Sequence, residues 1–285
     1  MRWNPGTVGG KVRVIASALV ALVLLAPLLA GGSGRVAHAQ FGGVLPGLES
    51  NVDLDVPLEI EPRPAWVRSF TCPIVYTHEV PSRAAFRGLL VGLRAYGYEP
   101  ISLRTLDQAF TGAVPVPHGC MVLTFDDALM SQSLNALPVL IELKIPAVFF
   151  VMPDFDDGVH TYMRPAQIKA LTVAGEEVMA HTCNHATLPT LLRRNPMAFL
   201  AEIVDCRARV EAITNRSISY IAYPNGSYDA PVIEELRDAG YAAAFTTRPS
   251  SFLSASSPYT LPRIAFNPSE TAGSLVSRMR NPTPS

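Results

Sequence analysis

The sequence predicts an α/β protein in which about seven parallel strands form an incomplete (β/α) barrel. Short apolar segments alternate along the chain with segments of helical spacing, which is typical of βα units. The apolar segments lack polar alternation, as expected for strands that are covered on both faces. The predicted strand number falls about one short of the usual eight of a complete barrel.

The predicted elements follow one another in order. A helix is predicted over 83–96, because the apolar residues Phe86, Leu89, Leu90 and Leu93 fall on one helical face and Gly97 follows as a stop signal. Seven predicted strands cover residues 73–76, 121–125, 147–151, 177–180, 220–223, 241–246 and 261–266, and a weak additional strand covers 99–103. The other predicted helices cover residues 106–110, 133–142, 165–174, 196–213 and 231–239.

The N-terminal 39 residues differ from the rest of the chain. A basic start precedes the apolar run 14–30, and Ala37-His38-Ala39 fits the small-x-small cleavage pattern. We therefore predict a secretory signal over 1–39 and export of the mature chain to the cell envelope or beyond. An uncleaved membrane anchor is the alternative, although the apolar run is short for a span and Pro27 interrupts it.

Three further segments follow the signal. Residues 40–70 are rich in Pro, Gly and acidic residues and are predicted to form a linker or an extended arm. Residues 71–266 form the predicted folded domain, and 267–285 a tail with a short helix and a frayed end. The net charge is -1, with no basic run beyond the N-terminus, so no nucleic-acid partner is expected. Oligomeric state is not predicted.

Four cysteines remain after the predicted signal. We predict the disulfides Cys72–Cys120 and Cys183–Cys206, because export favours oxidation. Cys72 and Cys120 precede their strand ends by a similar distance, and Cys206 lies on the helix that follows Cys183. Four buried thiols are one alternative, and Cys183 as a metal ligand is another.

Polar residues follow three of the predicted strands. These are Asp126-Asp127, His181-Thr182-Cys183-Asn184-His185, and Tyr223-Pro224-Asn225-Gly226. Functional groups of parallel βα proteins collect at the carboxyl ends of strands. A carboxylate with two imidazoles suits zinc, and iron(II), cobalt or nickel are also compatible. A second aspartate would then be free to act as a general base. Each motif alone is weak, since Asp-Asp is often a helix cap and HxxxH is often one helical face.

In this order, the motifs TFDD, HxxxH and the Pro-Gly loop resemble the polysaccharide deacetylases of carbohydrate esterase family 4, the NodB-homology domain. The resemblance covers roughly Cys72 to Phe266 and implies the distorted barrel of that family. It implies that Asp127, His181 and His185 bind the metal and that Asp126 is the catalytic base. It also implies a metal-bound water as nucleophile and an oxyanion site near Tyr223, Pro224, Asn225 and Gly226.

Two departures from the family pattern point to its poly-N-acetylglucosamine deacetylase branch. The arginine that orients the base is missing before Tyr223, and no histidine follows His185. We expect His78, after the first strand, to supply the general acid; a loop histidine without a role is the alternative. We expect Arg263 to pair with Asp126; a salt bridge elsewhere on the rim is the alternative.

The predicted function is therefore removal of N-acetyl groups from an amino-sugar polymer, such as poly-N-acetylglucosamine, peptidoglycan or a chitin-like glycan. An O-acetyl esterase with the same site, or a non-catalytic glycan-binding relative, is the alternative. A glycosidase is a third reading, but no suitably spaced partner glutamate stands out at a strand end.

Overall fold

The computed structural model describes residues 69–153 and 161–282. The strands of its main sheet are β2 (Ile74–Thr77), β3 (Glu99–Pro100), β4 (Cys120–Phe125), β5 (Val148–Val151), β6 (Glu177–Ala180), β7 (Tyr220–Ala222), β8 (Ala243–Phe245) and β10 (Ile264–Ala265). Seven of these described strands run parallel in the order β10-β2-β4-β5-β6-β7-β8, and β3 pairs with the start of β4. They form a curled half-barrel, which confirms the predicted fold class.

The segment 261–265 links the two outer strands of this order. Leu261 forms a parallel bridge to Phe245 at the end of β8, and β10 then pairs in parallel with β2. The strand predicted over 261–266 is thus divided between two neighbours. Pro262, which has no amide hydrogen, separates the two pairings. As a result, one short segment joins both edges of the curled sheet.

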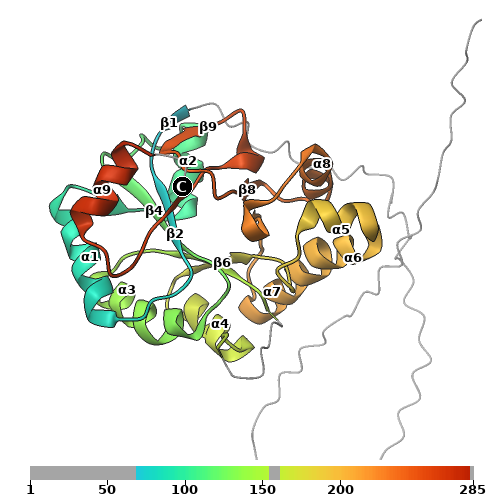
Figure 1. The fold of residues 1–285 in the computed structure, drawn as a ribbon, viewed down its shortest axis with the longest axis horizontal. Coiled ribbons are helices and arrows are strands. Elements are labelled where there is room, and N and C mark those ends of the chain that lie inside the picture. The colour runs from blue at the N-terminus through green and yellow to red at the C-terminus, as the bar shows by residue number, and fades with distance from the viewer. Residues whose placement is uncertain (1–68, 154–160, 283–285) are drawn as a thin grey trace, which may run out of the picture. The chain divides into compact units, whose positions relative to one another are not determined.

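Most of the helices surround the outside of the curled sheet (Figure 1). The helices are α1 (Arg83–Ala95), α2 (Leu103–Thr111), α3 (Leu137–Leu143), α4 (Pro165–Val173), α5 (Leu188–Arg194), α6 (Pro196–Leu200), α7 (Cys206–Thr214), α8 (Ala230–Asp238) and α9 (Ala272–Arg280). Two π-helical turns, η1 (Gln132–Ala136) and η2 (Ala201–Asp205), precede α3 and α7. Helix α9, in the predicted tail, packs against α1.

The helices begin where the sequence supplies capping side chains. The hydroxyl of Ser82 accepts a hydrogen bond from the amide of Ala85 at 3.2 Å and so satisfies one free donor of α1. The N-cap side chains of α2, α8 and α9 make equivalent bonds; they are Ser102, Asp229 and Thr271.

Two apolar clusters lie on the two faces of the sheet. The larger cluster joins alternate strand residues such as Val75, Leu123 and Phe149 to the surrounding helices. The smaller cluster contains the other strand residues, such as Val122 and Phe150, and also includes Leu103, Leu106 and Phe110 of α2. Both faces of the strands are therefore buried, as the absence of polar alternation predicts.

Several elements differ from those expected. The antiparallel pair β1 (Ser69–Thr71) and β9 (Phe252–Ser254) is additional, and β1 takes in the last two residues of the predicted arm 40–70. The helix predicted over 196–213 is divided into α6, η2 and α7, and α5 precedes it. Strands β1 and β9 are each three residues long, too short for a hydrophobic period to be recognised in the sequence.

The predicted signal, 1–39, and the predicted arm up to residue 68 lie outside the described residues. Within 69–153 and 161–282, no helix is both long and apolar enough to cross a membrane.

Candidate active site

The first part of the site is the pair of carboxylates that follows β4. All six residues of this strand are buried, and the amide of Asp126 donates to the carbonyl oxygen of Thr77 at 3.0 Å. Asp127 and Ala128 then adopt positive φ angles of 72° and 58°. Non-glycine residues rarely adopt this conformation, and it is found preferentially at functional sites.

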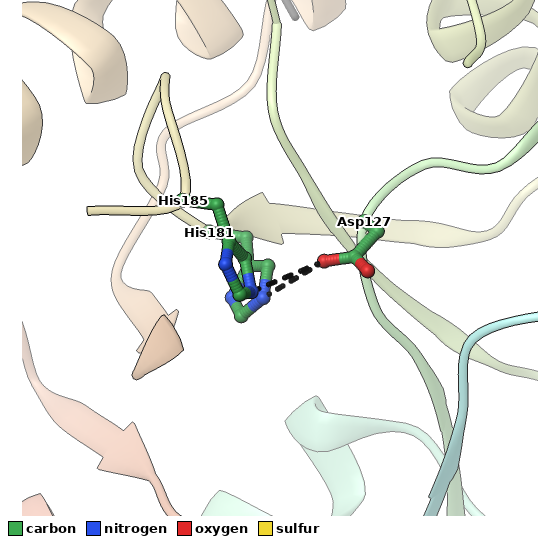
Figure 2. A group of neighbouring side chains, drawn as sticks. All are labelled: Asp127, His181 and His185. Atoms are coloured by element: carbon green, nitrogen blue, oxygen red, sulfur yellow. Dashed lines mark ion pairs between the residues drawn. The ribbon is translucent and has the colours of Figure 1, made fainter. Parts of the chain in front are cut away.

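The structure brings Asp127, His181 and His185 together (Figure 2). The Asp127 Oδ1 atom lies 3.2 Å from His181 Nε2 and 3.6 Å from His185 Nε2. One ligand atom from each residue lies within 4.8 Å of the others. Burial alone would raise the pKa of the Asp127 carboxyl, but the neighbouring imidazoles of His181 and His78 lower it.

The orientation of His181 suits a metal ligand. Its Nδ1 atom lies 2.8 Å from the carbonyl oxygen of Ala222, so Nδ1 carries the proton and Nε2 presents a lone pair. In the described part of the chain, His181 Nε2 and Asp127 Oδ1 are both buried without a hydrogen bond. Two buried atoms that face each other and lack partners fit a divalent cation held between them.

Asp126 is held by Arg263 from the segment that links β8 to β2. The two guanidinium nitrogens, Nη1 and Nη2, each donate to one carboxylate oxygen at 2.7 Å. The side chains of Arg263 and Asp126 are 0% and 2% exposed. Burial would raise the pKa of Asp126, but the charges of Arg263 and His181 hold it below its ordinary value. Asp126 is thus fixed in its ionised form, with its oxygens oriented.

His78 lies one residue beyond β2 and borders the same cavity. Its Nε2 atom is 3.9 Å from Asp127 Oδ2, and its side chain is 48% exposed. The imidazole ring meets the ring of Tyr76 edge-on, with centroids 5.7 Å apart. The structure therefore brings His78 close to Asp127 but leaves it accessible to a bound molecule.

The loop after β7 forms another wall of a cavity of about 470 Å³, to which Asn225 contributes. Gly226 has a φ of 63°, and a Cβ atom there would lie 2.1 Å from Thr247 Oγ1, so only glycine fits. The Tyr223 hydroxyl donates a hydrogen bond to the carbonyl oxygen of Tyr259 at 3.0 Å, so its proton is not available to a molecule in the cavity. Pro224, in the same loop, is buried.

Two features hold the histidine segment in place. Cys183 and Cys206 form a disulfide. The second predicted disulfide, away from this segment, joins Cys72, just before β2, to Cys120 at the start of β4. Glu202, in η2, accepts hydrogen bonds from the amides of Cys183 and Asn184 at 2.8 and 3.1 Å. The segment between the two histidines is therefore fixed to η2 through Glu202 and to the start of α7 through Cys206.

Sequence reasoning missed several residues of the site. Tyr76 and Thr247 border the cavity, and Glu202 holds the histidine segment. Tyr76 and Thr247 lie close to the carboxyl ends of β2 and β8, so their position alone could have indicated them. No sequence signal points to Glu202.

Residues 113–244 match the family model described as Polysaccharide deacetylase. This chain carries a polysaccharide deacetylase domain. The family consists of hydrolases that remove acetyl groups from acetylated sugar polymers, so the predicted enzyme class is confirmed.

Several relatives resemble the deacetylase domain. The chitooligosaccharide deacetylase of Sinorhizobium fredii is 33% identical over 142 residues, which are 50% of this chain and 60% of the relative. The poly-beta-1,6-N-acetyl-D-glucosamine N-deacetylase of Escherichia coli K12 is 26% identical over 229 residues, 65% of this chain and 34% of that enzyme. The Bacillus subtilis protein YxkH is 22% identical over 72% of this chain and 75% of its own length. The chain thus spans about a third of the Escherichia coli enzyme.

Solved structures share the fold of the deacetylase domain. IcaB from Ammonifex degensii superposes with a TM-score of 0.65 at 23% identity, over 74% of this chain and 97% of IcaB. The Streptococcus pyogenes deacetylase PplD gives 0.66 at 22% identity, over 74% of this chain and 99% of PplD. At this level of identity the comparison concerns the fold alone.

Proposed function

We propose that this protein is a metal-dependent hydrolase that removes N-acetyl groups from an amino-sugar polysaccharide. The observation that carries the proposal is the convergence of Asp127, His181 and His185 beside an aspartate that is ion-paired and buried. In the reaction, water adds across the amide C–N bond and yields acetate and the free amine of the sugar.

We assign Asp127, His181 and His185 as the metal ligands and favour zinc, with cobalt, nickel or iron(II) as other suitable ions. A cation bound there would lower the pKa of a coordinated water and polarise the acetyl carbonyl. The hydrogen bond from His181 Nδ1 to Ala222 supports this assignment, because it directs Nε2 at the proposed ion.

Asp126 is the proposed general base. Its carboxylate is held ionised by Arg263, so it can accept a proton from the attacking water. Arg263 thereby replaces the arginine that the family pattern places before Tyr223. The bidentate contact also fixes the direction of the carboxylate oxygens.

His78 is the proposed general acid, which donates a proton to the leaving amine as the C–N bond breaks. Its partial exposure and its position beside Asp127, at the cavity that the ligand histidines also line, support this role. The oxyanion that develops on the acetyl carbonyl would be met by the backbone amide of Asn225. The amides of Tyr223 and Gly226 are used in other backbone hydrogen bonds, and Pro224 has none.

Poly-β-1,6-N-acetylglucosamine is the substrate we favour, with chitin-like oligomers and peptidoglycan as the other candidates. The Escherichia coli relative named for the first polymer aligns with 65% of this chain, and the Sinorhizobium relative is named for chitooligosaccharides. The presence of His78 early in the chain, without a histidine after His185, also favours poly-N-acetylglucosamine, because this pattern resembles the branch that deacetylates that polymer.

We further propose that residues 1–39 are a secretory signal, that residues 40–70 are an arm, and that the protein acts outside the cytoplasm. Two disulfides among the described cysteines support an oxidising compartment.

Acetate release tests the function. Chelated protein, restored with zinc, is assayed on poly-β-1,6-N-acetylglucosamine, chitin oligomers, peptidoglycan and O-acetylated xylan. We expect activity on an N-acetylated polymer, loss on chelation and recovery with zinc. Release from the O-acetylated polymer alone would make the protein an esterase, and release from none would leave the glycan-binding alternative.

Variants separate the roles. Asp127→Asn and His181→Ala should lose both metal and activity, because each removes a ligand. His78→Asn should retain metal while its turnover falls by about 100-fold or more, the typical contribution of general acid catalysis. A His78→Asn enzyme with near-normal turnover on the amide would refute His78 as the acid.

A further inference from the structure

We propose that Gln132 is a positioning residue that sets His78 relative to Asp126. The inference rests on the proposed function, in which these two residues are the general acid and the general base. Gln132 itself lies at the start of η1, six residues after Asp126, and would not contact the substrate.

Gln132 bridges the two catalytic segments through its amide. Its Nε2 atom donates to the carbonyl oxygen of His78 at 2.6 Å and to that of Asp126 at 2.5 Å. Both partners are acceptors, so the nitrogen of the carboxamide must face them. The side chain is fully buried, with 0% exposure. One NH₂ group thus ties the end of β2 to the end of β4.

Two neighbours of Gln132, Ser131 and Asn135, hold the backbone of Val80, two residues after His78. Ser131 Oγ accepts a hydrogen bond from the amide of Val80 at 3.1 Å, and Asn135 Nδ2 donates to the carbonyl oxygen of Val80 at 2.8 Å. Residues 131, 132 and 135 lie on one side of a helical turn. The side chains of these three residues therefore fix the backbone of residues 78–80. Of the three, Gln132 is the one that also contacts Asp126.

The His78 side chain depends on this backbone support. The residue lies beyond the last ladder position of β2, its side chain is about half exposed, and its described side-chain neighbours are the Tyr76 ring, which meets it edge-on, and the Asp127 carboxylate at 3.9 Å. Gln132 Oε1 is buried without a partner among the described residues, so the two donated bonds orient the carboxamide. Gln132 opens a π-helical turn, a feature that often occurs at functional sites.

The proposal predicts which substrates depend on Gln132. An amine leaves only if it is protonated, whereas nitrophenolate leaves as an anion. A displaced His78 should therefore slow hydrolysis of an N-acetylated glycan much more than hydrolysis of p-nitrophenyl acetate. Displacements of about 1 Å can lower rates by about 100-fold.

The test compares wild-type protein with Gln132→Met, which keeps the length of the side chain and removes both hydrogen bonds. We expect kcat on the glycan to fall by about 10- to 100-fold, with KM within about twofold and unchanged zinc content. The ratio of glycan to nitrophenyl ester rates should fall at least tenfold. In a His78→Asn background the same substitution should have little further effect, because it acts through His78.

Val139→Ala is the matched control for lost stability, since Val139 is buried in the adjacent α3 and does not line the cavity. It should lower thermal stability without changing the substrate ratio. An unchanged ratio in Gln132→Met, or an equal loss with and without His78, would overturn the positioning role. Wild-type protein that releases no acetate from any N-acetylated glycan would instead overturn the proposed function, and this inference with it.

Discussion

The Asp126–Arg263 ion pair is the most deeply buried pair of opposite charges that we describe at the site. An unpaired charge in such a position is strongly destabilising. We predict that Arg263→Met lowers the free energy of unfolding by about 3–5 kcal/mol, because Asp126 would remain buried without its partner. Urea unfolding measures this change.

Two comparisons make that prediction specific to the buried pair. Combining Arg263→Met with Asp126→Asn should restore part of the lost stability, since the uncompensated charge is removed. Arg193→Met breaks an exposed pair with Asp229 and should cost at most about 1 kcal/mol. Equal losses for Arg263→Met and Arg193→Met would contradict the argument.

Gly226 gives a second prediction at the scale of a residue. We predict that Gly226→Ala lowers deacetylation at least tenfold, because the added methyl group would collide with Thr247 and move the loop that carries Asn225. Gly175→Ala is the control: its φ is also positive, at 96°, but nothing lies within 4 Å of the added atom. It should cost about 1–2 kcal/mol of stability through strain alone and leave turnover unchanged. Steady-state kinetics on the glycan decides between these outcomes.

At the scale of elements, the two π-helical turns share a function that the predicted helices did not reveal. η1 supplies Gln132 to the His78 and Asp126 carbonyls, and η2 supplies Glu202 to the amides of the histidine segment. Both turns follow a segment that carries proposed ligands.

We predict that Glu202→Gln weakens zinc binding by about 10- to 100-fold, the usual effect of losing a group that orients metal ligands. The substitution replaces a carboxylate oxygen by an NH₂ group that faces other donors. Zinc competition with a chromogenic chelator measures the affinity. Glu211→Gln is the control, because Glu211 accepts from the amide of Ile218 outside the site. Unaltered affinity in Glu202→Gln would show that the disulfide alone holds the segment.

The sequence predicts the strands and the motifs at their ends well, because each depends on local pattern. The apolar run before Asp126 and the histidines after β6 are examples. It does not predict how helix 196–213 divides or where Glu202 points. These depend on contacts between distant segments, and hydrophobic period alone cannot distinguish a π-helical turn from a regular one. The sequence leaves two possibilities for Arg263, a pair with Asp126 or a salt bridge elsewhere on the rim. The structure decides between them, because the segment 261–265 joins β8 to β2 and brings Arg263 to Asp126.

At the scale of the whole molecule, titratable groups lie at both ends of the barrel. Asp107 of α2 accepts a hydrogen bond from the Tyr220 hydroxyl at the start of β7, and Glu176 accepts from the amide of Ala147 before β5. Burial, reinforced by the nearby charge of Glu177, raises the pKa of Asp107 to about 7. Burial also raises the pKa of Glu176 to about 7.

These raised pKa values predict that stability depends on pH. The folded state binds protons that the unfolded state releases near pH 4, so this stabilisation is complete below about pH 4 and is lost as pH rises to about 7. Asp107→Asn should make the decline between pH 5 and 7 less steep, by up to about 1.4 kcal/mol per pH unit. Urea unfolding at several pH values tests this, with the exposed Glu234→Gln as the control. A slope that Asp107→Asn leaves unchanged would contradict it.

The segment 261–265 has a consequence for biogenesis. A chain emerging from a ribosome or a translocation channel presents Asp126, Asp127 and both ligand histidines long before Arg263 is available. Until that segment inserts between β8 and β2, Asp126, the proposed base, has no guanidinium to hold it and the sheet remains open. On the proposed mechanism, hydrolytic competence therefore arrives only after the other strands of the sheet have been delivered, and a chain that stops before residue 263 would be inert.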